Sequence, residues 1–185
     1  MKTARIYTND FNKIIAATKD FVSPFGSKKY HQFIKLEFRS ETSRVTAIAV
    51  DGFRMSVETA VISDCEEDFD VYVKSNIKLP NKMYARISLE ETEAIVRCNG
   101  FSFGYEQPSG GEFLDWQKVI PTEEVAYKIA FNGNYLLQAL QAARISNGGF
   151  SSPVVLEFRS PLSPILIKTG KSNVKMVLPI RINKE

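Results

Sequence analysis

Side chains that could perform chemistry are few in this chain. It holds one histidine, His31, and two cysteines, Cys65 and Cys98. A single imidazole excludes a His-rich metal site and any mechanism that needs two histidines. His31 could act as a base only beside a nucleophile and an orienting acid, and the sequence pairs it with neither. We interpret His31 as a surface or partly packed residue and the cysteines as free thiols, although their spacing also allows a disulfide.

The remaining candidates for catalysis are equally weak. Residues 64–68 read Asp-Cys-Glu-Glu-Asp, an acidic run that could collect a divalent cation but lacks the ligand spacing and glycine of a calcium loop. We therefore interpret it as a solvated turn between strands. The sequence holds no G-x-S-x-G, phosphate-binding P-loop, H-E-x-x-H or C-x-x-C motif. The expectation is a protein that is not an enzyme and has no metal and no cofactor.

Composition sets the remaining bounds. The chain has 185 residues, 44% hydrophobic and 24% charged, which is enough for one domain or two small ones with a core of their own. The net charge of +3 permits a polyanionic partner without implying one. No apolar run is long enough to span a membrane, and the first residues lack the apolar core of a signal peptide. A cytoplasmic location is the expectation.

Most of the chain alternates apolar and polar residues with a period of two, which predicts β-strands. Asp51-Gly52 and Asn99-Gly100 stand between β-rich runs and predict two tight hairpins, because these residue types tolerate positive φ. The expected strands are residues 4–7, 34–39, 45–50, 53–62, 69–74, 84–89, 93–98, 101–106, 125–131, 154–159, 165–168 and 174–182.

Two segments instead have helical spacing of their apolar residues. The first is residues 10–22, with Asn9 or Asp10 as N-cap. The second is residues 134–145, with Asn134 as N-cap and a stop near residues 147–149. Their expected buried faces consist of Phe11, Ile14, Ile15, Thr18, Phe21 and Val22 in the first helix, and Leu136, Leu137, Leu140 and Ala143 in the second. Both helices are short and one-sided, so each is expected to lie on a sheet.

An internal repeat organises these elements. Residues 36–40, Leu-Glu-Phe-Arg-Ser, recur letter for letter as residues 156–160. The surrounding pattern is a strand, a helix and three strands, near residues 1–62 and again near 125–185. Residues 69–121 carry the strands of such a unit, but residues 75–82 are too short and Pro-broken for its helix. The predicted fold is α+β and sheet-dominated, with antiparallel strands and two short helices packed on the sheets, built from βαβββ-type units.

Three stretches carry a resemblance to a known family. They are residues 45–55 (Val-Thr-Ala-Ile-Ala-Val-Asp-Gly-Phe-Arg-Met), residues 113–121 (Phe-Leu-Asp-Trp-Gln-Lys-Val-Ile-Pro), and a C-terminal block formed by residues 131–137, 161–165 and 177–182. In order and spacing, these stretches resemble the bacterial β sliding clamp, the β subunit of DNA polymerase III. The resemblance spans most of the chain.

The resemblance implies a shortened clamp-like fold. Members of the family have three domains of two units each, whereas this chain has about three units in all. Residues 1–121 look like the middle domain, with two half-units, and residues 122–185 like the second half of the last domain. A family ring contains roughly twelve such units, so a ring of this chain would need four copies.

The function implied by the resemblance is that of a processivity factor. Such a protein docks short peptide motifs of replication and repair proteins and tethers them to duplex DNA without reading its sequence. The alternative is a monomeric adaptor or decoy that docks the same motifs and does not encircle DNA. A small hydrolase is a remote third reading.

Two surfaces follow from the resemblance, residue by residue. The implied peptide groove uses Gly52, Phe53, Arg54, Met55, Pro121, Asn132, Tyr135, Leu162, Pro164, Met176, Val177, Leu178, Pro179, Ile180, Arg181 and Ile182. Pro179 cannot donate to a β-ladder, which suits an edge strand beside an open pocket. The implied DNA-facing residues are Lys13, Lys19, Lys28, Lys29 and Arg144. From the residues alone, the apolar members could equally be core, and the basic members ordinary solvated side chains.

Overall fold

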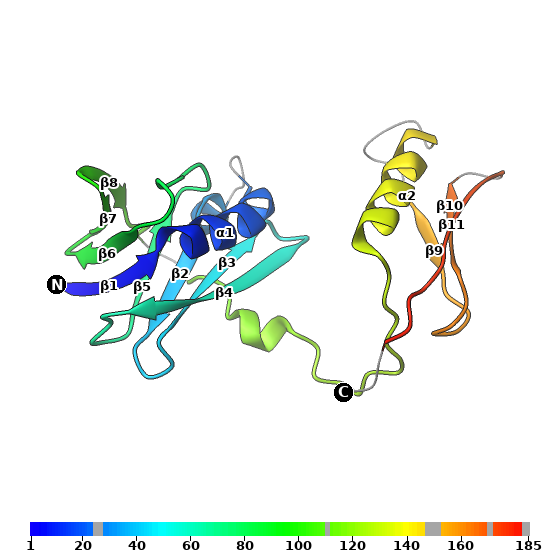
Figure 1. Cartoon of the computed structure of the whole chain (residues 1–185), viewed down its shortest axis with the longest axis horizontal. Coiled ribbons are helices and arrows are strands. Elements are labelled where there is room, and N and C mark those ends of the chain that lie inside the picture. The colour runs from blue at the N-terminus through cyan, green and yellow to red at the C-terminus, as the bar shows by residue number, and fades with distance from the viewer. Residues whose placement is uncertain (24–27, 110–111, 147–152, 170–171, 183–185) are drawn as a thin grey trace. The chain divides into compact units, whose positions relative to one another are not determined.

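The computed structural model describes residues 1–23, 28–109, 112–146, 153–169 and 172–182. The chain divides into two compact units, Met1–Ile120 (unit 1) and Pro121–Glu185 (unit 2). Each unit is described by itself (Figure 1). The predicted domains, 1–121 and 122–185, have almost the same boundary, and their assignment as a clamp-like domain and half-domain stays a prediction.

Unit 1 is built around one antiparallel sheet with the strand order β5-β2-β3-β4-β1-β6-β7-β8. Its first half has the predicted strand–helix–strand–strand–strand order, and both predicted hairpins are present. Strand β4 begins at Met55 and not at Phe53 as predicted, because residues 51–54 form the turn that precedes it. The strands are β1 (Lys2–Tyr7), β2 (Ile34–Arg39), β3 (Arg44–Val50), β4 (Met55–Ser63), β5 (Phe69–Val73), β6 (Tyr84–Glu90), β7 (Glu93–Cys98) and β8 (Phe101–Glu106).

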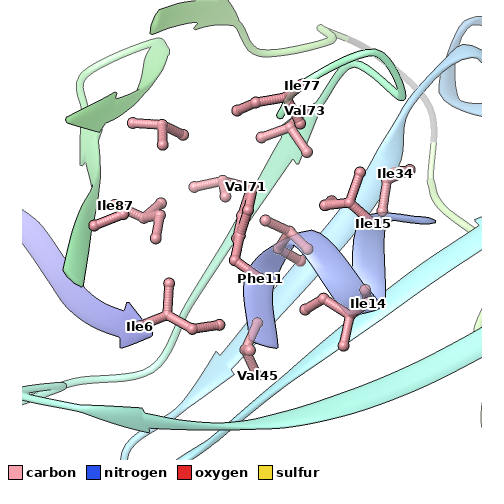
Figure 2. Packing of buried hydrophobic residues seen from close by; sticks show 14 of the residues in the cluster. Ile6, Phe11, Ile14, Ile15, Ile34, Val45, Val71, Val73, Ile77 and Ile87 are labelled. Atoms are coloured by element: carbon pink, nitrogen blue, oxygen red, sulfur yellow. The ribbon is translucent and has the colours of Figure 1, made fainter. Parts of the chain in front are cut away.

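Helix α1 (Thr8–Thr18) supplies one wall of the core of unit 1. Phe11, Ile14 and Ile15 recur at helical spacing and are buried. Figure 2 shows them in one cluster with strand residues that include Ile6, Ile34 and Ile87. The helix is shorter than predicted, since a 3-10 turn, η1 (Lys19–Phe21), replaces its last residues.

The predicted N-cap of this helix is wrong. Tyr7 occupies the N-cap position and makes no side-chain cap hydrogen bond. The Asn9 carboxamide instead accepts a hydrogen bond from the Lys82 N–H at 2.9 Å, and the Thr8 N–H donates to the Met83 carbonyl at 2.9 Å. The start of α1 is therefore held by a distant loop, which local sequence does not reveal.

That loop stands where the repeat pattern would place a second helix. Residues 74–83 are all described and contain no helix, in agreement with the Pro-broken sequence. Ile77 and Leu79 point into the core and are buried. Asn12 of α1 binds both backbone groups of Leu79, donating to its carbonyl at 2.8 Å and accepting from its N–H at 2.9 Å. The loop thus fills the core in place of a helix.

Unit 2 is smaller and packs one helix on a three-stranded antiparallel sheet of order β11-β10-β9. Its elements are α2 (Gly133–Ser146), β9 (Val155–Glu157), β10 (Ile165–Thr169) and β11 (Asn173–Val177). The buried members of its core are Ala143, Ile165, Ile167 and Val177. Leu137, predicted to face this core, is instead exposed. The predicted stop at residues 147–149 lies outside the described residues.

One strand prediction for unit 2 is wrong, and another is too long. Residues 125–131 form no strand, and their ladder is a single bridge from Ala130 to Ile180. The predicted strand at residues 174–182 ends at Val177, which stands opposite Ile165, the first residue of its partner β10. Pro179, two residues further on, has no N–H to donate to a ladder.

The fold is α+β and sheet-dominated, with antiparallel strands and two α-helices in the described residues, as predicted. No helix among the residues that the structure describes is long and apolar enough to cross a membrane.

Candidate functional site

The turn between β3 and β4 is built by one carboxylate. Asp51 Oδ1 accepts hydrogen bonds from the N–H groups of Phe53 and Arg54, each at 2.9 Å. Its Oδ2 accepts from the Arg54 guanidinium at 2.7 Å and 3.0 Å. The bond from the Phe53 N–H and the contact with Arg54 lower the pKa of Asp51 to about 2. Gly52 takes a φ of +94°, which a side chain would strain.

This turn presents one large apolar side chain to solvent. Phe53 at its tip is 97% exposed. Arg54 holds the turn against η1, since its guanidinium donates to the Asp20 carbonyl at 3.0 Å and lies 5.2 Å from the centre of the Phe21 ring. Phe53 is therefore carried on a rigid support and not on a loose loop.

A hollow of about 460 Å³ opens beside the turn, entirely within unit 1. A further wall comes from residues 112–119, which contact strands β2 and β5. Phe113 packs against the rings of Tyr30 and Tyr72, with ring centres 6.4 Å and 5.9 Å apart. The Trp116 indole N–H donates to Glu37 at 3.4 Å, and burial raises the pKa of Tyr72 to about 12. The lining residues are Lys28, Tyr30, His31, Val50, Gly52, Phe53, Arg54, Met55, Glu112, Phe113, Leu114 and Val119.

Four predicted groove residues, Gly52 to Met55, therefore line one hollow. Sequence reasoning missed its other walls, although two signals for them were present. The stretch at residues 113–121 is one of the three that carry the family resemblance, but Pro121 is its only residue among the predicted site residues. His31 is predicted to be a surface or partly packed residue, and in the structure it lines the hollow.

In unit 2 some of the predicted groove residues line a hollow and others do not. Leu162, Ile180, Arg181 and Ile182 line a hollow of about 290 Å³ together with Lys128, Ala130 and Pro161. Three exposed residues lie outside the lining of this hollow, namely Tyr135, Met176 and Leu178. Two of the predicted prolines, Pro164 and Pro179, are half-buried, and Pro121 is exposed.

Two members of the predicted groove have structural roles in unit 2. Val177 is buried in its core and so presents no surface to a ligand, contrary to its predicted role. Asn132 caps α2 in place of the predicted Asn134, since its side-chain oxygen accepts from the N–H groups of Asn134 at 2.9 Å and Tyr135 at 3.4 Å.

The basic residues predicted to face DNA are dispersed. Lys13 and Lys19 line a hollow of about 660 Å³ between α1 and residues 75–81, where Lys78 joins them and Asp20 opposes them. Lys28 lies at the hollow beside the turn, Lys29 is exposed in η2 (Lys29–Gln32), and Arg144 is exposed in the last turn of α2.

The remaining reactive groups are placed as follows. Cys65 and Cys98 are both free thiols, and Cys98 is buried. The acidic run forms the predicted turn, in which Asp64 pairs with Arg5 at 2.9 Å and Glu67 with Lys2 at 3.4 Å. Within the described part of the chain, no three His, Cys, Asp or Glu side chains are grouped to hold a metal ion.

No family model and no curated protein sequence matches this chain significantly. Several solved structures, in contrast, match this chain. The Bacillus subtilis DNA polymerase sliding clamp superposes with a TM-score of 0.82 at 19% identity, over 99% of this chain and 50% of that one. The fold is that of a bacterial sliding clamp.

Further clamp structures agree. The Streptococcus pneumoniae DNA polymerase III β chain gives a TM-score of 0.78 at 18% identity, covering 100% of this chain and 51% of that one. The Helicobacter pylori β clamp, solved bound to a DNA ligase peptide, gives 0.75 at 14% identity, covering 98% and 52%. The chain therefore spans about half the length of these clamps.

Proposed function

We propose that this chain is a non-enzymatic, sliding-clamp-like processivity factor. It docks short peptide motifs of replication and repair proteins and tethers them to duplex DNA. The observation that carries the docking role is the hollow beside Gly52–Met55, which has an exposed aromatic residue on a braced turn. A concave, largely apolar surface with a few polar groups at its rim is the usual form of a peptide or small-ligand site.

The proposed groove has an affinity that can be estimated. Burying about 300 Å² of apolar ligand surface would contribute roughly 7–8 kcal/mol before costs. Ordering a flexible peptide and removing its translational freedom cost several kcal/mol of this free energy. A dissociation constant on the order of micromolar is therefore expected. Met55 lines the hollow of unit 1, and Leu178 is exposed in unit 2.

The docking role is tested with a fluorescent DNA ligase peptide of the kind bound by the Helicobacter clamp. We expect Met55→Arg and Leu178→Glu each to weaken binding at least tenfold, because each places a charge in an apolar contact. The matched controls are Val61→Arg and Val174→Glu, which place the same charges on exposed residues of β4 and β11 outside the groove. Normal binding by both groove variants would remove the docking proposal.

DNA tethering is tested separately with circular and linear duplexes. A clamp that encircles DNA stays on a closed circle and leaves after the circle is cut. Lys13→Glu with Lys19→Glu should reduce salt-sensitive association, since contacts with phosphates release counterions. Peptide binding without retention on circular DNA would favour the monomeric adaptor over the clamp.

A further inference from the structure

The repeated sequence Leu-Glu-Phe-Arg-Ser has opposite surroundings in its two copies. In unit 1, Leu36 and Phe38 are 0% exposed. In unit 2, the corresponding Leu156 and Phe158 are 41% and 46% exposed. Identical side chains have the same preference for burial, so the difference must come from what covers them.

In unit 1 the covering element is β5. Strand β2 pairs with β3 on one edge and with β5 on the other, so that Leu36 stands opposite Val71, and Phe38 opposite Phe69. The rings of Phe38 and Phe69 stack with their centres 4.6 Å apart. The arginine of the motif is engaged as well, since Arg39 pairs with Asp70 of β5 at 2.7 Å.

Strand β9 lacks this second neighbour. It lies at the end of the sheet and pairs with β10 alone among the strands described in unit 2. Leu156 stands opposite the buried Ile167, so it points to the side of the sheet that holds the core. Arg159 pairs with Glu157 of its own segment. An open strand edge with inward apolar residues beside it is a site for another strand.

Unit 2 also contains a strand sequence that, in the described part of the chain, makes only the single bridge from Ala130 to Ile180. Residues 125–131 read Val-Ala-Tyr-Lys-Ile-Ala-Phe, with alternating apolar residues, yet Val125 and Tyr127 are 62% and 50% exposed. The equivalent segment of unit 1 is β1, which also leads directly into a helix. Strand β1 pairs with β4 of its own half at two positions, and along its whole length with β6 of the other half.

We propose that two copies of this chain associate through unit 2 by exchanging these segments. Residues 125–131 of each copy pair as a strand with β9 of the other and cover Leu156 and Phe158. The exchange is reciprocal, so it closes as a two-fold symmetric dimer and needs no third partner. It reproduces between two chains the pairing that β1 and β5 make within unit 1. This inference does not depend on the proposed peptide or DNA binding.

The proposal is tested on the full chain by sedimentation over a range of concentrations. We expect a species of twice the 20.9 kDa chain mass, or an even multiple of it. Leu156→Glu and Phe158→Glu should each raise the concentration needed for association at least tenfold. Val155→Glu is the matched control, because this neighbour points to the other face of β9, opposite Lys168, and should associate normally.

A backbone variant tests the exchanged strand itself. Tyr127→Pro removes an N–H from a segment that makes no ladder at this position in the single chain, so it should abolish association without lowering the melting temperature of the monomer. In the wild type, amide hydrogens of residues 125–129 should gain protection as concentration rises. A monomer at 100 μM, or association that survives both Leu156→Glu and Tyr127→Pro, overturns the proposal. Protection of these amide hydrogens that does not change with protein concentration also overturns the proposal.

Discussion

At the scale of single residues, the candidate site depends on Asp51 more than on any side chain that would touch a ligand. Its two oxygens hold two backbone N–H groups and the guanidinium of Arg54. Phe53, in contrast, makes almost no contact with the protein. Within this one short turn, Phe53 therefore presents the surface for a ligand, and Asp51 holds the turn in place.

We predict that Asp51→Asn destabilises unit 1 by about 1–2 kcal/mol, because the substitution loses the ion pair and weakens the charge-assisted hydrogen bonds. Urea unfolding at pH 7 measures the loss. Glu41→Gln, a neutralisation in the exposed turn between β2 and β3, is the control and should change stability by less than about 0.5 kcal/mol. Equal effects of the two substitutions would show that Asp51 does not hold the turn.

The difference in unfolding free energy between the wild type and Asp51→Asn depends on pH. The pKa of Asp51 is about 2 in the folded chain, and an unfolded aspartate has a pKa of about 3.9. The stabilisation is therefore present in full above the unfolded value and is lost as pH falls from about 4 towards 2. The difference between wild type and Asp51→Asn should shrink over that window, and a difference that grows there would contradict the assignment.

At the scale of elements, unit 1 lacks a helix where its repeat would place one. The loop at residues 74–83 packs against the core in its place. Ile77 and Leu79 enter the core, and Asn12 holds the loop by satisfying both backbone groups of Leu79. A buried backbone segment outside regular structure needs such partners for its N–H and C=O groups. One side chain of α1 therefore replaces part of a helix's internal hydrogen bonding.

We predict that Asn12→Ala costs about 2 kcal/mol, since it leaves two backbone groups of a buried residue without partners. Hydrogen exchange at the Leu79 amide should accelerate in the same variant, which links the lost stability to this loop. Lys13→Ala, the adjacent exposed residue of α1, is the control for helix propensity and should leave that amide protected. Unchanged exchange in Asn12→Ala would mean that the loop is held by its apolar residues alone.

Elements were predictable where their pattern was local. The alternation in β2 and the spacing of Phe11, Ile14 and Ile15 depend on neighbours in sequence, and the structure confirms both. The cap of α1 was not predictable, because Asn9 bonds to Lys82. Residues 125–131 have a strand sequence without a strand, because a strand also needs a paired neighbour. Half of the candidate hollow was missed since its far wall depends on ring contacts of Phe113 with distant residues.

At the scale of the whole molecule, the two units differ greatly in their cores. Unit 1 buries a large cluster from α1 and strands β1 to β7, whereas the buried members of unit 2's cluster are Ala143, Ile165, Ile167 and Val177. Hydrophobic stabilisation grows with the apolar area removed from water. We therefore expect unit 2 to be the less stable unit, and a second copy that covers its exposed residues would stabilise it more as concentration rises.

We predict that the chain unfolds in two steps, with unit 2 first. Trp116 is the single tryptophan and contacts Glu37, so its fluorescence reports unit 1, whereas far-UV circular dichroism reports both units. Ile167→Ala should lower only the first transition and Ile87→Ala only the second, because each leaves a cavity that costs about 2–5 kcal/mol in its own core. The first transition should also rise with protein concentration. Coincident transitions from the two probes, shifted alike by both substitutions, would instead mean that the units unfold as one cooperative body.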